Sequence, residues 1–240
     1  MRTPTRPSPV AARVAGALYL SASAGFLVVF SWLAQHFGYP DVLERSASEV
    51  LPQLLSLGAG GRAMWAVYAL LPLALIPASI AAAHALRLPD GRNPLALKLA
   101  ERLQAVAAVS MMLGLARWST AQWVLATAWA DADATARVGL AATFDALNAM
   151  FGNGIGEFVG ELTLYGSFLA FAVALVARGQ RRIAMLATLT ALCGWIGMFR
   201  NITASTQWAA DIGNVLLPLF LITFGMVLLR GPAVCPAQTQ

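Results

Sequence analysis

Histidine and cysteine are scarce in this sequence, and their scarcity argues against several kinds of site. The two cysteines, Cys193 and Cys235, are too few and too far apart for a disulfide framework or a cysteine-based metal site. The two histidines, His36 and His84, are predicted on opposite sides of the membrane, a membrane thickness apart, so a bis-histidine haem is not expected. The sequence therefore predicts no metal site and no cofactor.

Charged residues are also few. They make up 11% of the chain, whereas soluble domains usually contain about 25%. Hydrophobic residues make up 59%, and several apolar runs reach the ~20 residues that cross a bilayer. These runs are continuous rather than alternating, which argues against a β-barrel. The basic residues lie between apolar runs, so no nucleic-acid partner is expected. The composition predicts a multi-pass helical membrane protein whose partner is the lipid bilayer.

Motifs for nucleotide binding and serine catalysis are missing. The glycine cluster at 58–61 lacks the Lys-Ser/Thr pair that a phosphate-binding loop requires. No histidine lies near a serine that could serve as a nucleophile. The sequence therefore names no reaction by motif.

The apolar runs predict an all-α integral membrane six-helix bundle. The first run resembles a secretory signal, but it continues to Trp32, which is too long for one, so we interpret it as the first span. A disordered tail (1–10) and a C-terminal tail (231–240) are expected to flank one six-span domain (11–230). The predicted spans are 11–35, 62–86, 97–130, 157–178, 182–200 and 207–230.

Shorter features are predicted between and within the spans. Residues 134–151 carry an apolar stripe at helical spacing, which predicts a short amphipathic helix before the fourth span. A second short helix is predicted in the first outer loop, over 42–57. Pro72 and Pro77 predict a kink in the second span, and residues 88–94 predict a turn. The third span would be ~50 Å long, so it must tilt, break or project from the bilayer.

The placement of Lys and Arg predicts the orientation. Because positive residues gather on the cytoplasmic side, both termini are expected in the cytoplasm. Four arginines are predicted outside, namely Arg45, Arg62, Arg137 and Arg200, and Arg117 lies within the third span. The residues predicted inside are Arg2, Arg6, Arg13, Arg87, Arg92, Lys98, Arg102, Arg178, Arg181, Arg182 and Arg230.

The segment 144–165 contains four glycines, and two of its carboxylates, Glu157 and Glu161, lie one helical turn apart. The glycines predict a break where the fourth span enters the membrane, and a broken helix often marks a binding site. A charged residue inside lipid is costly and indicates function. We expect Arg117 and Arg200 to pair with these carboxylates, and Glu161 to share a buried ion pair with Arg117.

Polar residues from several elements are predicted to converge in the outer third of the bundle. Glu157 and Glu161 are the candidate catalytic residues. The candidate ligand-binding residues are Arg117, Trp118, Gln122, Asn148, Asn153, Arg200, Asn201, Asp211 and Asn214. Trp118 and Trp195 would form pocket walls. A structural interpretation is also open, because Glu157 can stabilise a helix N-terminus and because Trp123, Trp129 and Trp208 can anchor at the interface.

Residues 13–20 (RVAGALYL) and 144–162 (FDALNAMFGNGIGEFVGEL) resemble a bacterial membrane family called domain of unknown function 4386. The spacing of Asp133–Arg137, Ala146–Asn148 and Gly154–Glu157 carries the resemblance. It covers residues from about 10 to 230 and implies a six-helix bundle in a bacterial plasma membrane. It implies no assigned activity.

Three functions are compatible with these patterns. The first is an outer pocket for a small amphipathic or isoprenoid-like ligand, with acid/base chemistry at the carboxylates as one version. The second is a small transporter, although the cytoplasmic half offers few polar residues. The third is a structural or accessory subunit, in which the ion pairs only fix helix contacts.

Overall fold

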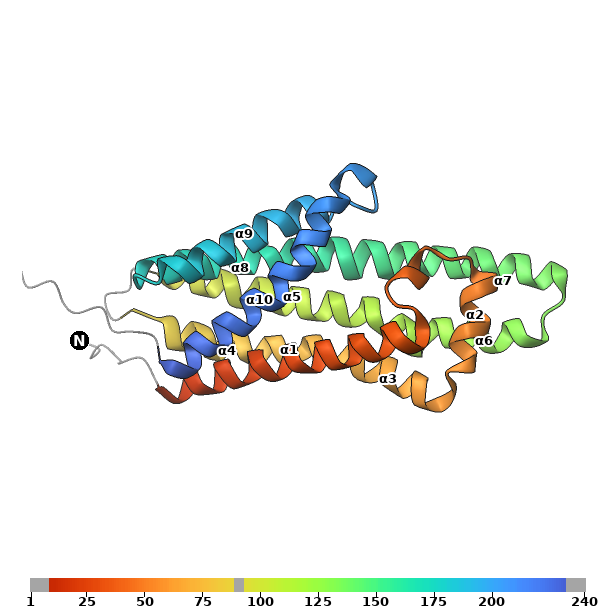
Figure 1. Ribbon diagram of the computed structural model, residues 1–240, viewed down its shortest axis with the longest axis horizontal. Coiled ribbons are helices and arrows are strands. Elements are labelled where there is room, and N and C mark those ends of the chain that lie inside the picture. Colours follow the sequence, from red (N-terminus) through yellow and green to blue (C-terminus); the bar gives the residue numbers. More distant parts are fainter. Residues whose placement is uncertain (1–8, 89–92, 232–240) are drawn as a thin grey trace, which may run out of the picture. The chain divides into compact units, whose positions relative to one another are not determined.

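The computed structural model describes residues 9–88 and 93–231, which form helices and no strands (Figure 1). The predictions for residues 1–8, for the centre of the turn at 89–92 and for the tail at 232–240 lie outside the described residues. Among the described residues, five stretches are long and apolar enough to cross a membrane. They are Pro9–Phe37, Gly58–Leu86, Pro94–Asp131, Ala134–Ala177 and Ala204–Arg230. The all-α prediction is confirmed, and the five stretches support a multi-pass membrane protein.

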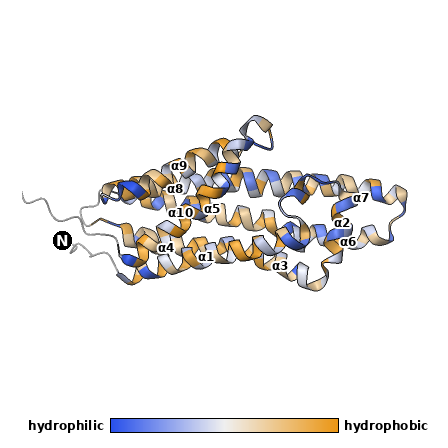
Figure 2. Cartoon of the chain, viewed as in Figure 1, coloured by the Kyte–Doolittle hydropathy of each residue, from blue (hydrophilic) through white to orange (hydrophobic). Residues whose placement is uncertain are grey.

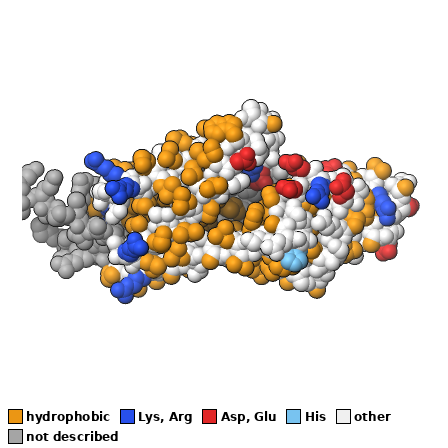
Figure 3. All heavy atoms as spheres, in the orientation of Figure 1, with side chains coloured by type: hydrophobic (Ala, Val, Ile, Leu, Met, Phe, Trp, Pro, Cys, Tyr) orange, Lys and Arg blue, Asp and Glu red, His pale blue; other side chains and the backbone are white. Residues whose placement is uncertain are grey.

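Large apolar side chains are exposed along these stretches. Val28 is 68% exposed, Val173 59% and Val215 67%. Figure 3 shows hydrophobic side chains covering much of the visible surface. Such a surface would be costly in water and is favourable against lipid tails. The exposed residues therefore support the membrane assignment independently of helix length.

The chain divides into two compact units. Unit 1 comprises Met1–Ser23, Leu73–Ala108 and Gly160–Gln240, and unit 2 comprises Ala24–Pro72 and Val109–Val159. Two helices, α1 (Pro9–Phe37) and α5 (Pro94–Ser119), contribute one part to each unit.

In unit 1, four helices accompany the first parts of α1 and α5. They are α4 (Leu75–Leu86), α8 (Gly160–Ala177), α9 (Arg181–Gly197) and α10 (Gln207–Arg230). Helix α9 packs closely on α8 and α10. A Cβ on Gly194 would lie 2.1 Å from the Tyr165 ring, and one on Gly197 would lie 2.7 Å from the Ala210 backbone. Small residues thus bring these backbones together, as is common between membrane helices.

Arg178 joins two helix ends in unit 1. This residue follows α8 and is 7% exposed. Its Nε donates to the Leu86 carbonyl at 2.9 Å, and its Nη2 donates to the Arg87 carbonyl at 3.1 Å. The last carbonyls of a helix have no partner within the helix, so Arg178 caps α4. Burial lowers the pKa of the Arg178 guanidinium, but an arginine keeps its charge at neutral pH.

Unit 2 contains several further helices besides the second parts of α1 and α5. They are η1 (Asp41–Glu44), α2 (Ala47–Ser56), α3 (Gly58–Leu70), α6 (Ala121–Asp131), α7 (Ala134–Leu147) and the π-helical segment η3 (Asn148–Val159). Helix α2 contacts α6 and α7, and it buries Ala47, Val50, Leu51 and Leu54. In Figure 2, α2, α6 and α7 carry more hydrophilic residues than α1 and α10 do.

Proline and a local break shape the second and third stretches. The second stretch passes through a 3-10 turn, η2 (Leu71–Ala74), which contains Pro72. Proline lacks the N–H that an α-helix needs, so the predicted distortion occurs there. The third stretch breaks at Thr120, between α5 and α6. One of the predicted outcomes for this long span, a break, is therefore observed.

The predicted break at the glycines is wrong. Helix α7, η3 and α8 follow one another without an interruption, and the 12 residues of η3 are wound as a π-helix. The amphipathic segment before the fourth span is consequently not a separate helix. A Cβ on Gly156 would lie 2.9 Å from the Gly114 Cα. The glycines thus permit a wide helix that lies close to α5, because they have no side chain to keep the backbones apart.

Candidate functional site

A buried arginine forms the centre of a polar network in unit 2. Arg117 lies near the end of α5 and is 7% exposed. Its Nε donates to Asn148 Oδ1 at 3.0 Å, and its Nη1 donates to the Gly114 carbonyl. Its guanidinium carbon lies 5.0 Å from the centroid of the Trp118 ring. The charge is therefore held mainly by an amide, a carbonyl and an aromatic face.

Asn148 connects this arginine to a second helix. Asn148 Oδ1 also accepts from Gln122 Nε2 at 3.0 Å, and Gln122 Nε2 lies 3.5 Å from the Phe144 carbonyl. Gln122 is completely buried. One acceptor at the start of η3 thus receives donors from α5 and α6. Four predicted site residues, Arg117, Trp118, Gln122 and Asn148, are brought together here.

The π-helical segment makes room for the arginine. A Cβ on Gly152 would lie 2.7 Å from Arg117 Nη2, so a larger residue would displace the guanidinium. Glu157, at the other end of η3, contributes a favourable charge interaction with Arg117. The pairing of Arg117 with Glu157 stays a prediction.

Aromatic rings surround one side of the network. Trp118 stacks on Trp65 with centroids 5.1 Å apart, and the Phe37 and Phe144 rings contact Trp118 edge-on. The indole N–H groups of Trp65 and Trp118, together with Gln122 Oε1, have no hydrogen-bond partner among the described residues. Buried polar atoms usually have a hydrogen-bond partner, so three buried atoms without one in a single cluster mark this region as a candidate functional site. The prediction did not include Trp65.

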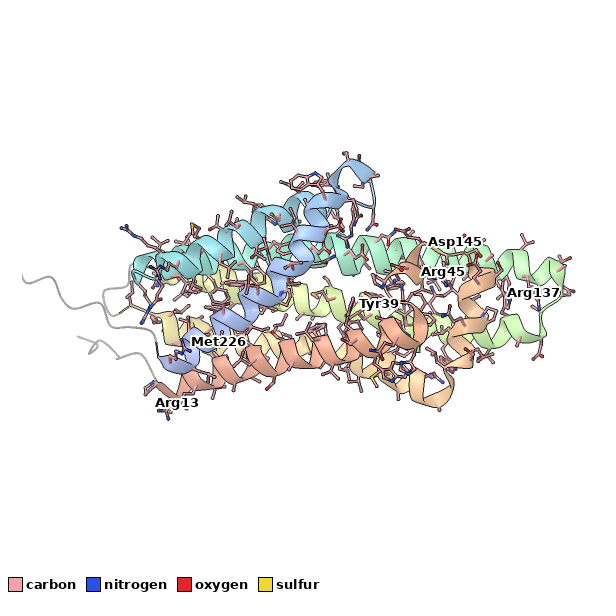
Figure 4. The ribbon with its side chains drawn as sticks, in the orientation of Figure 1. Arg13, Tyr39, Arg45, Arg137, Asp145 and Met226 are labelled. Atoms are coloured by element: carbon pink, nitrogen blue, oxygen red, sulfur yellow. The ribbon has the colours of Figure 1, made fainter. Side chains whose placement is uncertain are left out.

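A groove opens beside this cluster, between α2, α6 and α7. Its volume is about 540 Å³, and its walls are Ser48, Pro52, Leu55, Ser56, Ala126, Trp129, Ala130 and Arg137. The Arg137 guanidinium carbon lies 5.4 Å from the Trp129 ring centroid, and Arg137 Nη2 lies 3.5 Å from the Trp129 carbonyl. Figure 4 shows Arg137 near the turn between α6 and α7. The sequence prediction missed this groove. The available signal was that Ala126 and Trp129, which line the groove, follow the predicted site residue Gln122 at helical spacing and so lie on the same face of α6.

The other predicted residues with described contacts lie in unit 1. Arg200 binds Glu161 through both carboxylate oxygens, at 2.8 and 2.9 Å, which confirms the predicted pairing of these two residues. Their side chains are 19% and 20% exposed. Asp211 accepts from Gln207 at 2.9 Å, one helical turn away. Trp195 donates to the Leu162 carbonyl at 3.0 Å.

Asn153, Asn201 and Asn214 are exposed. The pairing of Glu161 with Arg117 stays a prediction. Among the described residues, no three His, Cys, Asp or Glu side chains lie together as metal ligands would.

Comparison of the chain with protein-family models, with curated proteins and with solved structures finds no match.

Proposed function

We propose that the protein is a six-span membrane protein of the bacterial plasma membrane that binds a small amphipathic or isoprenoid-like ligand in unit 2. The sixth span is α9. Its 17 residues correspond to ~26 Å, slightly less than a bilayer core, and it packs on two longer apolar helices. Residues 11–230 then form one domain, as the resemblance to the domain of unknown function 4386 family also implies.

The positive-inside rule supports cytoplasmic termini, and the sequence prediction that Arg45, Arg62 and Arg137 lie outside supports an extracytoplasmic position for the groove. Arg87, Arg178 and Arg181 lie at helix ends of unit 1, and the end of α8 is tied to the end of α4 through Arg178. Figure 3 shows Lys and Arg side chains gathered at one end of unit 1. That end would face the cytoplasm.

The groove is the observation that carries the binding proposal. Ligand sites are commonly concave, mostly apolar and about 300–1,000 Å³ in volume, with a few polar groups that orient the ligand. The groove of unit 2 has this character: Leu55 and Trp129 supply apolar walls, and Arg137 supplies a charged edge. The buried network joins α5, α6 and η3, so α6, which supplies part of the groove wall, is held in place by hydrogen bonds.

Binding is favoured over acid/base catalysis at Glu161. Both oxygens of this carboxylate accept from Arg200, an arrangement that stabilises the ionised form. An ionised carboxylate cannot donate a proton, so Glu161 is poorly suited to be a general acid. We propose that it fixes α8 to the end of α9.

Co-purification tests the binding function. The wild-type protein and two variants are extracted in native nanodiscs, and the retained small molecules are analysed by mass spectrometry. Ala130→Phe places a ring at the exposed rim of the groove, whereas Ala128→Phe adds the same ring at an exposed position that does not line it. An amphipathic molecule should be retained by the wild type and Ala128→Phe and lost from Ala130→Phe. Equal retention by all three would contradict binding in the groove, and retention by none would support a scaffold.

A further inference from the structure

We infer that the groove between α2, α6 and α7 selects amphiphiles with an acidic head, a carboxylate or a phosphate, and that Arg137 binds this head. The inference rests on the proposed binding function and adds the chemistry of the ligand. The proposal follows from the distribution of apolar and polar groups along the groove.

The tail is assigned from the apolar walls. Pro52 and Leu55 on α2 face Ala126 and Trp129 on α6 across the groove. None of these side chains offers a free charge, and Trp129 is 8% exposed. A hydrocarbon chain would gain the burial energy of such walls without losing hydrogen bonds.

The head is assigned from Arg137. Its guanidinium carbon lies 5.4 Å from the Trp129 ring centroid, and its Nη2 lies 3.5 Å from the Trp129 carbonyl. An arginine guanidinium carries further N–H groups in a planar fork, whose geometry matches carboxylate and phosphate oxygens. In the described part of the chain, no carboxylate lies within ion-pair distance of this guanidinium. Ser48 and Ser56 add hydroxyl groups to the rim.

The acidic residues closest in sequence to the groove residues do not line the groove. Asp133 accepts from the Ala136 N–H at 2.8 Å and so caps α7. Glu49 accepts from the Ser46 hydroxyl at 3.1 Å at the start of α2. Asp131 ends α6 and is exposed. Arg137 is the charged residue that lines the groove, so it carries the proposed preference for an acidic head.

The test compares one tail with four heads. The wild-type protein in phosphatidylcholine nanodiscs is titrated with dodecanoate, dodecyl phosphate, dodecanol and dodecylammonium, and bound adducts are measured by native mass spectrometry, with empty nanodiscs as the blank. Arg137→Gln removes the proposed partner of the head. Arg45→Gln removes the same charge from an exposed position of unit 2 that does not line the groove.

Arg137→Gln should weaken the preferred acidic probe at least ~10-fold, the size of one charge-assisted hydrogen bond. Dodecanol binding should not change, and Arg45→Gln should behave as the wild type does. Preference for dodecanoate would indicate a fatty-acid-like ligand, and preference for dodecyl phosphate a phosphate monoester.

Three results would overturn the inference. If all four amphiphiles bind equally and Ala130→Phe abolishes their binding, the groove binds the tail and does not distinguish the head group, and the proposed function survives. If dodecylammonium binds best, the assigned charge is wrong. If no probe binds, the inference and the proposed function fail together.

Discussion

Replacement of Asn148 by alanine should destabilise unit 2 more than any other single loss of a polar side chain. Asn148 Oδ1 accepts from Arg117 Nε and from Gln122 Nε2, each at 3.0 Å. Hydrogen bonds between membrane helices average ~0.6 kcal/mol and reach ~1.7 kcal/mol. Here both donors are at least nine-tenths buried and would be left without this acceptor, and one of them is charged. A loss of about 2–4 kcal/mol in the free energy of unfolding is expected.

The assay is equilibrium unfolding in mixed micelles of increasing sodium dodecyl sulfate content, followed by tryptophan fluorescence. Asn148→Asp keeps an oxygen for both donors and should lose less than about 1 kcal/mol. Asn214→Ala, at an exposed position of α10, is the matched control and should change stability by less than ~0.5 kcal/mol. A double-mutant cycle of Asn148→Ala with Gln122→Leu should be non-additive, because Asn148 and Gln122 are joined by a hydrogen bond. If Asn148→Ala is as stable as Asn214→Ala, or if the cycle is additive, the network does not hold the unit together.

Three further predictions concern packing and charge. Glu161→Gln should lower the free energy of unfolding by about 1–2 kcal/mol, a range reduced because the ion pair is one-fifth exposed. Arg200→Lys should show a similar loss, since lysine cannot bind both oxygens of Glu161. No change in either variant would count against a stabilising pair. Gly114→Ala should lower the free energy of unfolding by about 1–3 kcal/mol, because its Cβ would lie 2.7 Å from the Gly156 Cα. Gly139→Ala, whose Cβ would have nothing within 4 Å, should instead stabilise α7 by ~0.5–1 kcal/mol. Equal effects of the two changes would refute the close approach of α5 and η3. Arg178→Met should cost about 2 kcal/mol through the lost cap of α4, and an unchanged unfolding midpoint would show that the cap is dispensable.

The sequence predicted the buried network better than it predicted the groove. Arg117, Gln122 and Asn148 stand out because polar residues are rare in apolar stretches, and their burial cost demands partners from neighbouring helices. Trp129 and Arg137 carried no such signal. A tryptophan at a span end resembles an interfacial anchor, and an arginine in a loop resembles an orientation signal. Their juxtaposition depends on how α6 and α7 fold back on α2, which residue type alone does not reveal.

The glycine segment shows a different limit. Gly152, Gly154 and Gly156 correctly indicated unusual backbone, since glycine costs helix stability unless a close approach or a special conformation requires it. Residue type could not distinguish a broken helix from a widened one. The choice depends on tertiary contacts, namely the Arg117 side chain at Gly152 and the α5 backbone at Gly156.

Protection of a cysteine in the groove tests the central claim most directly. In a variant with both native cysteines replaced by alanine, Ser48→Cys places a thiol on the groove wall, and Ser205→Cys places one on an exposed turn of unit 1 as the control. A membrane-impermeant maleimide added to intact cells should label both positions. Dodecanoate or dodecyl phosphate should slow labelling at position 48 severalfold and leave position 205 unchanged. Failure to label position 48 from outside, or equal rates with and without both amphiphiles, would contradict an extracytoplasmic groove that binds an acidic amphiphile.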